Sequence, residues 1–73
     1  MKEKHRICIS SPPDREKLVA EIFFGDTQWA EINQEGNELE IEFYPRPEGG
    51  PWRIEYDAAL NALDEAKRRL AGE

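Results

Sequence analysis

Cysteine and histidine are nearly absent from this sequence of 73 residues, which holds one of each, Cys8 and His5. A lone cysteine cannot form an intrachain disulfide, so the chain is not a disulfide-stapled secreted scaffold. One histidine and one cysteine cannot supply the four ligands of a closed zinc site. Positions 5 and 8 of a strand point to opposite faces, which argues against a Cys–His nucleophile pair. We therefore expect no metal, no cofactor and no catalytic residue.

Long apolar runs are also missing. The basic N-terminal stretch Lys2 to Arg6 is followed only by Ile7-Cys8-Ile9, which is too short for the core of a signal peptide. No stretch approaches the length needed to span a bilayer. We expect a cytoplasmic protein that does not bind membranes.

Basic residues are outnumbered, 10 against 16 acidic ones, which gives a net charge of −6. Nucleic acids and anionic membranes both require a basic face on the protein that binds them. The charge therefore predicts no direct contact with nucleic acid or membrane, and it is compatible with a basic protein partner. The alternative interpretation is that the acids only solvate the surface.

The length of the chain predicts a single small α+β domain over residues 1–73. A chain of this size buries only roughly 60% of the surface that its unfolded form exposes, so its core is thin. Residues 1–16 are a candidate for a loosely attached N-terminal strand and Pro-Pro linker.

Alternating apolar and polar residues, interrupted by glycine and proline, predict a series of strands. They span residues 5–10, 17–24, 28–33, 38–44 and 52–56. For residues 17–24, a helix that starts at the preceding prolines is the alternative. The clearest strand is 38–44, where three apolar residues alternate with three glutamates, so that one face is apolar and the other acidic.

The first hairpin turns at Gly25-Asp26-Thr27, where glycine provides the positive φ that such turns need. A three-residue loop there sets Ile22 beside Ala30 and Phe23 beside Trp29. A two-residue loop inverts those faces.

The second hairpin has its predicted tip at Glu35-Gly36. Apolar residues then meet apolar ones on one face, which is the agreement expected between pattern and turn. The predicted opposite pairs are Ile32–Leu39, Ala30–Ile41, Gln28–Phe43 and, on the other face, the like-charged pair Glu31–Glu40.

After Asp57, a predicted N-cap, the apolar period changes from two to about 3.6, which indicates a helix that stops near Gly72. Its apolar stripe comprises Ala59, Leu63, Ala66 and Leu70, with Leu60 and Ala62 at the flanks. The predicted fold class is α+β, an antiparallel four- to five-stranded β-meander packed on one C-terminal α-helix (β-β-β-β-β-α).

One helix covers one face of a small sheet, so the other face meets water or a partner. The residues predicted to form a partner-binding surface on that face are Trp29, Glu31, Glu38, Glu40, Glu42 and Tyr44. Aromatic residues anchor interfaces and charge steers the partner. The leading hypothesis is a non-enzymatic protein-binding module that contacts a basic partner. The alternative is a self-associating structural or regulatory domain, so the chain is a monomer or a homodimer.

Several segments of the chain resemble short bacterial proteins, the immunity partners of polymorphic toxins. The similar segments are Trp29–Asn33, Glu40–Pro47, Pro51-Trp52, Tyr56–Leu60 and Ala66–Leu70. Acidic immunity proteins often cap basic nuclease toxins, so the resemblance implies an immunity or inhibitor-type protein with a basic partner. The basic stretch Lys2 to Arg6 departs from a simple acidic cap.

Overall fold

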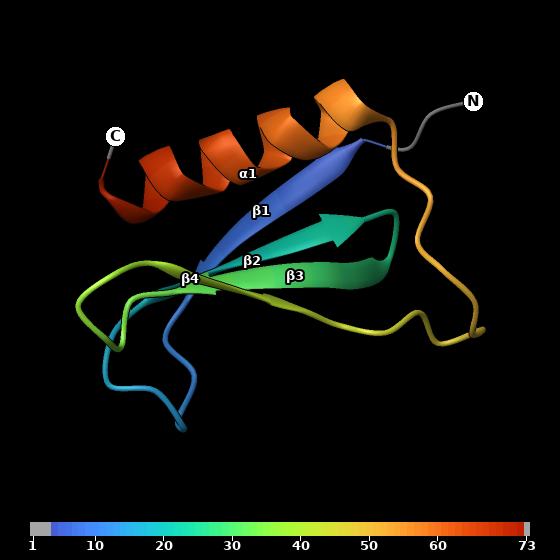
Figure 1. The fold of residues 1–73 in the computed structure, drawn as a ribbon. Coiled ribbons are helices and arrows are strands. Elements are labelled where there is room, and N and C mark those ends of the chain that lie inside the picture. The colour runs from blue at the N-terminus through green and yellow to red at the C-terminus, as the bar shows by residue number, and fades with distance from the viewer. Residues whose placement is uncertain (1–3, 73) are drawn as a thin grey trace.

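The computed structural model describes residues 4–72, which form an antiparallel sheet with one helix on one of its faces (Figure 1). The elements are β1 (His5–Ser10), β2 (Val19–Phe24), β3 (Thr27–Asn33), β4 (Glu40–Phe43) and α1 (Tyr56–Leu70). The strands lie in the order β1-β2-β3-β4, each antiparallel to its neighbour. The predicted meander followed by a C-terminal helix is confirmed. Residues 2 and 3 of the basic N-terminal stretch lie outside the described residues.

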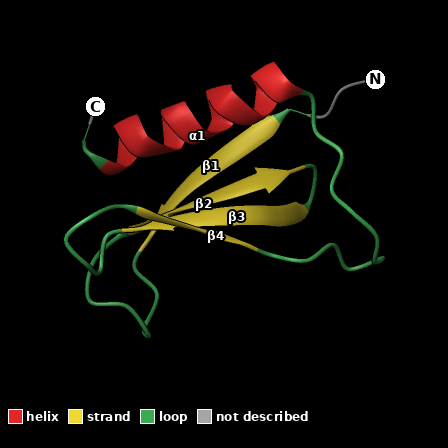
Figure 2. Cartoon of the chain, viewed as in Figure 1, coloured by secondary structure: helices red, strands yellow, loops and turns green. Residues whose placement is uncertain are grey.

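The fifth strand predicted at 52–56 is wrong, because residues 44–55 contain no strand and form a long connection to α1 (Figure 2). Three prolines in this connection cannot donate hydrogen bonds to a ladder. Gly49 and Gly50 adopt positive φ of 84° and 76° and turn the chain between the second and the third of these prolines. The alternating residues Trp52 and Ile54 instead pack partly against the core beside the helix.

The hairpin between β2 and β3 turns on Gly25 and Asp26, a loop of two residues. Gly25 occupies the first turn position with φ of 63°, as a type II′ turn requires. The paired residues are Phe24–Thr27, Phe23–Gln28 and, beyond a register shift, Ile22–Ala30. This β-bulge leaves Trp29 without an opposite residue and restores the predicted Ile22–Ala30 pair.

Trp29 lies in the hydrophobic core and not on the glutamate face, so that prediction is wrong. Its ring stands edge-on to Phe24, with 5.2 Å between ring centres, and is tilted against Phe43 at 5.4 Å. Only 8% of Trp29 is exposed. The strict alternation that placed it beside Glu31 fails because a bulge inserts a residue and re-aims its side chain.

β4 is shifted by two residues along β3 from the predicted register. The pairs are Ala30–Phe43, Glu31–Glu42, Ile32–Ile41 and Asn33–Glu40. A shift of two keeps every side chain on its predicted face. The connecting loop spans 34–39 and is held by the Glu35 carboxylate, which accepts the backbone N–H groups of Glu16 and Lys17 at 3.3 and 3.1 Å. This contact ties the loop, which is longer than the predicted tight turn, to the chain before β2.

Helix α1 begins at Tyr56, one residue before the predicted N-cap. Asp57 therefore lies in the first turn, where its charge favours the helix dipole, and makes no capping hydrogen bond. At the other end Gly72 adopts φ of 92° and donates its N–H to the carbonyl of Arg69 at 3.0 Å. The predicted stop at Gly72 is confirmed.

The helix covers only the half of the sheet formed by β1 and β2 (Figure 1). Ala62 and Ala66 are fully buried in this contact, because their small side chains let the helix approach closely. A helix is roughly 10 Å wide and strands lie about 4.8 Å apart, so one helix covers about two strands. The buried core residues are Ile7, Ala20, Ile22, Phe24, Trp29, Ala30, Ile32, Ala62 and Ala66.

Candidate functional site

The face of the sheet opposite α1, called the outer face below, is covered in part by the loop between β1 and β2 (Figure 1). Arg15 of this loop donates from Nη2 to Glu31 Oε2 at 2.9 Å and to Glu42 Oε1 at 3.0 Å. These two glutamates lie directly opposite each other on β3 and β4. Burial opposes the charge on Arg15, but the two carboxylates outweigh it and raise the Arg15 pKa. One guanidinium therefore relieves a like-charge pair that would otherwise be destabilising.

Tyr44 completes this cluster. Its hydroxyl lies 3.2 Å from Glu31 Oε1 and 3.4 Å from Glu42 Oε1, and can donate to either. Burial, together with the nearby carboxylates, raises the pKa of Tyr44 to about 12. Only 5% of Glu31 is exposed. Glu31 and Tyr44 are thus occupied by contacts within the molecule and present little surface to a partner.

The six residues predicted as a binding surface divide into three groups. One cluster contains Glu31 and Glu42, which both accept from Arg15, and Tyr44, whose hydroxyl contacts Glu31. Glu38 and Glu40 are exposed near β4, and Trp29 is in the core. Arg15 was missed because it lies in a proline-containing loop with no periodic pattern, so nothing in the sequence ties it to the glutamates.

The half of the outer face formed by β1 and β2 carries one acidic residue, the half-buried Glu21, which lies between Cys8 and Glu31. The guanidinium of Arg6 lies 4.3 Å from the ring centre of Phe23, a cation–π contact between neighbouring residues of β1 and β2. Cys8 is exposed beside them. Exposed acid is therefore concentrated along the β4 side of the sheet, in Glu38, Glu40 and Glu42.

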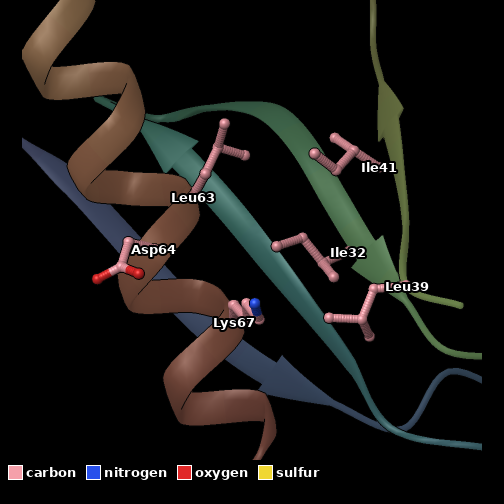
Figure 3. A pocket seen from close by; sticks show the side chains of 6 residues that line it. All are labelled: Ile32, Leu39, Ile41, Leu63, Asp64 and Lys67. Atoms are coloured by element: carbon pink, nitrogen blue, oxygen red, sulfur yellow. The ribbon is translucent and has the colours of Figure 1, made fainter.

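An open apolar groove lies on the helix side of β3 and β4. It encloses about 320 Å³ and is lined by Ile32, Leu39, Ile41, Leu63, Asp64 and Lys67. Figure 3 shows Leu63 extending from the helix toward the strands, with Ile32, Ile41 and Leu39 on the other wall. Leu63, which the sequence places on the apolar stripe of the helix, is half-buried and forms the helix wall.

The apolar residues next to this groove are unusually open. Leu39, Ile41 and Phe43 expose 44%, 45% and 58% of their surface. Leu60 on α1 is exposed as well. Contiguous apolar surface of this kind on a small protein marks a site of interaction or of aggregation. This exposed apolar surface follows from the width of the helix. It is predictable from the sequence by comparing the width of one helix with the spacing of four strands.

Ionisable side chains elsewhere contact one another across elements. His5 Nε2 on β1 lies 2.6 Å from Glu65 Oε1 on α1. The hydrogen bond with His5 and the charge of Arg69 lower the Glu65 pKa against the opposing effect of burial.

Within residues 4–72, no three His, Cys, Asp or Glu side chains are grouped so that they could hold a metal ion. The same residues include no helix with the length and apolar character required to cross a bilayer.

Comparison of the chain with protein-family models, curated proteins and solved structures gave no match.

Proposed function

We propose that this chain is a non-enzymatic protein-binding module that contacts a basic partner, as immunity or inhibitor-type proteins do. The observation that carries the proposal is the two-sided character of residues 38–43. Leu39, Ile41 and Phe43 are exposed on the helix side, while the alternating glutamates are exposed on or beside the outer face. A surface that offers apolar area together with charge of one sign suits a protein partner of the opposite sign.

The arrangement of polar groups supports binding over catalysis. Arg15, Tyr44, Glu31 and Glu42 hold one another, as His5 and Glu65 do. A catalytic pair of carboxylates needs unequal environments and access to substrate. Glu38 and Glu40, which are not part of the Arg15 cluster, are both exposed at the start of β4. Contact with a partner is therefore the use that these residues fit best.

The net charge of −6 supports a basic protein as the partner. It disfavours nucleic acid and anionic membranes, whose phosphates would be repelled. We expect the module to act in the cytoplasm of a bacterium. Self-association remains the competing hypothesis, since exposed apolar surface also serves homodimers.

The proposal is tested by affinity capture from an extract of the source organism, followed by titration of the purified partner. The variant Glu38→Lys/Glu40→Lys reverses two exposed charges and leaves the cluster around Arg15 intact. We expect this variant to bind at least about tenfold more weakly, and binding of the natural chain to weaken as salt increases.

The matched control is Glu16→Lys/Glu48→Lys, which makes the same change in net charge at exposed positions in the loops before β2 and after β4. Glu48→Lys also removes the surface ion pair of Glu48 with Arg46, at 3.6 Å. This control should retain binding to within about twofold, because only the general field of the protein changes. Capture of no partner at all, or equal weakening by both variants, would contradict the proposed surface.

A further inference from the structure

β4 forms one edge of the sheet and offers free peptide groups there. The backbone N–H of Tyr44 donates to the carbonyl of Trp29 at 2.9 Å, so Tyr44 faces β3. Peptide groups of an antiparallel strand alternate between its two sides. Glu42 therefore also faces β3, whereas the N–H and C=O groups of Ile41 and Phe43 point away from the sheet. The described residues place no strand beyond β4.

The opposite edge, β1, is tied to the helix. Arg69 Nη1 of α1 donates to the carbonyl of Ile7 at 3.3 Å, and Glu65 pairs with His5. β4 has no comparable contact with α1. The two edges therefore differ, and β4 is the one open to another strand.

The side chains around β4 specify which kind of strand fits. Glu40 and Glu42 lie on its outer face, with Glu38 just before the strand, and Ile41 and Phe43 lie on its helix face. If a second copy paired antiparallel with β4 and kept apolar residues on the helix face, glutamates would lie opposite glutamates in each register centred on Leu39 to Glu42. Like charges directly opposite each other destabilise a pair of strands. The register centred on Phe43 would set Ile41 opposite Pro45, which has no N–H to donate. A strand with lysine or arginine on that face has the complementary charge.

The helix face of β4 specifies where the added strand should carry apolar residues. A strand beside β4 would place alternate side chains next to Ile41 and Phe43, at the open side of the apolar groove. Apolar residues there would cover surface that α1 does not reach. The charged groups of Asp64 and Lys67 lie on the helix wall of the groove, and the aliphatic stem of Lys67 can pack along an apolar strand.

From these observations we infer that the partner docks by adding an extended segment antiparallel to β4, with basic residues facing Glu40 and Glu42 and apolar residues facing Ile41 and Phe43. The inference rests on the proposed function and adds the geometry of binding. Backbone hydrogen bonds supply affinity in this mode, and alternate side chains supply specificity.

The test attaches a synthetic segment to the C-terminus of the full chain. The segment has about eight residues, the length of an ordinary strand, in which lysine or arginine alternates with valine or isoleucine. A linker of about twenty glycine and serine residues spans roughly 25 Å and holds the segment at about millimolar effective concentration. We expect the amides of Ile41 and Phe43 to become protected from hydrogen exchange at least about tenfold, independently of protein concentration.

Methylation of backbone nitrogens distinguishes strand addition from other binding. In an antiparallel pair, the apolar residues of the segment direct their N–H groups at β4, since they lie opposite Ile41 and Phe43. N-methylation of the apolar residues should therefore abolish the protection, and N-methylation of the basic residues should leave it within about twofold. A segment of the same composition in scrambled order, and one with glutamate replacing the basic residues, should give no protection.

Each other outcome counts against the inference. Unchanged exchange at Ile41 and Phe43, equal protection by the scrambled segment, or equal sensitivity to both methylation patterns would overturn strand addition. Protection of the unmodified chain that grows with its concentration would assign the edge to a second copy. The proposed function fails separately, when the natural partner binds the Glu38→Lys/Glu40→Lys variant as well as the natural chain.

Discussion

The two halves of the sheet both carry apolar residues on the helix side, but α1 covers only the half formed by β1 and β2. On β2, Ala20 and Ile22 are fully buried beneath α1, whereas Ile41 and Phe43 at equivalent positions of β4 are open. Both strands place apolar residues at the alternate positions of the helix side, Ala20 and Ile22 on β2 and Ile41 and Phe43 on β4. The difference arises because one helix reaches about two strands. Apolar alternation on an edge strand can therefore specify a surface for a partner as well as part of a core.

Replacing the same residue type in both halves gives the largest expected contrast. Ile22→Ala should destabilise the protein by about 2–5 kcal/mol, because it leaves a cavity beneath the helix. Ile41→Ala should cost less than about 1 kcal/mol, because almost half of that side chain is already in water. Urea denaturation followed by circular dichroism measures both.

If Ile22→Ala does not fold, Ile22→Val serves in its place, with an expected cost of about 0.5–1.5 kcal/mol. Equal destabilisation by Ile22→Ala and Ile41→Ala would show that the β4 side is covered as well as the β2 side, contrary to the fold described above.

The outer face provides a second contrast, between Tyr44 and an ordinary tyrosine. Glu31→Gln should lower the Tyr44 pKa from about 12 toward the ordinary value of 10, while burial keeps it above that value. Because the folded pKa is raised, the stability that this group contributes is complete below pH 10 and is lost as pH rises toward 12. The ultraviolet absorbance of tyrosinate measures the titration, and Tyr44→Phe identifies its contribution. An unchanged Tyr44 pKa in Glu31→Gln would contradict the contact.

The smallest effect is expected at the contact that ties β1 to α1. The Glu65 pKa is lowered from 4.5 in the folded protein, so its contribution to stability is present above that pH and is lost as pH falls through the folded pKa. Glu65→Gln should be less stable than the natural chain near neutrality, and the difference should vanish in acid. Thermal unfolding at a series of pH values provides the test, with Asp64→Gln as the control on the same helix. A difference that is independent of pH would exclude this ion pair.

The meander and the helix were predictable because each rests on local periodicity. The parity of Leu39, Ile41 and Phe43 survives a two-residue shift in register, so the prediction of two unlike faces holds although the predicted pairs do not. Residues 5–10 likewise show the alternation of a strand, and β1 has those bounds. Patterns of this kind survive errors in loop length.

Features that depend on single insertions or distant contacts were not predictable in the same way. The bulge at Trp29 interrupts the alternation of side chains along β3, and no residue pattern in the sequence predicts it. The position of Arg15 over Glu31 and Glu42 depends on how a proline-containing loop folds across the sheet. Part of the predicted binding face is therefore internal structure, and the exposed surface lies toward β4.

Hydrogen exchange along β4 in the unmodified monomeric chain tests the open edge most directly. The amides of Glu42 and Tyr44 face β3 and should exchange at least about tenfold more slowly than those of Ile41 and Phe43, which face solvent. Comparable slow exchange at all four amides would mean that something already covers the edge, and would contradict an open β4.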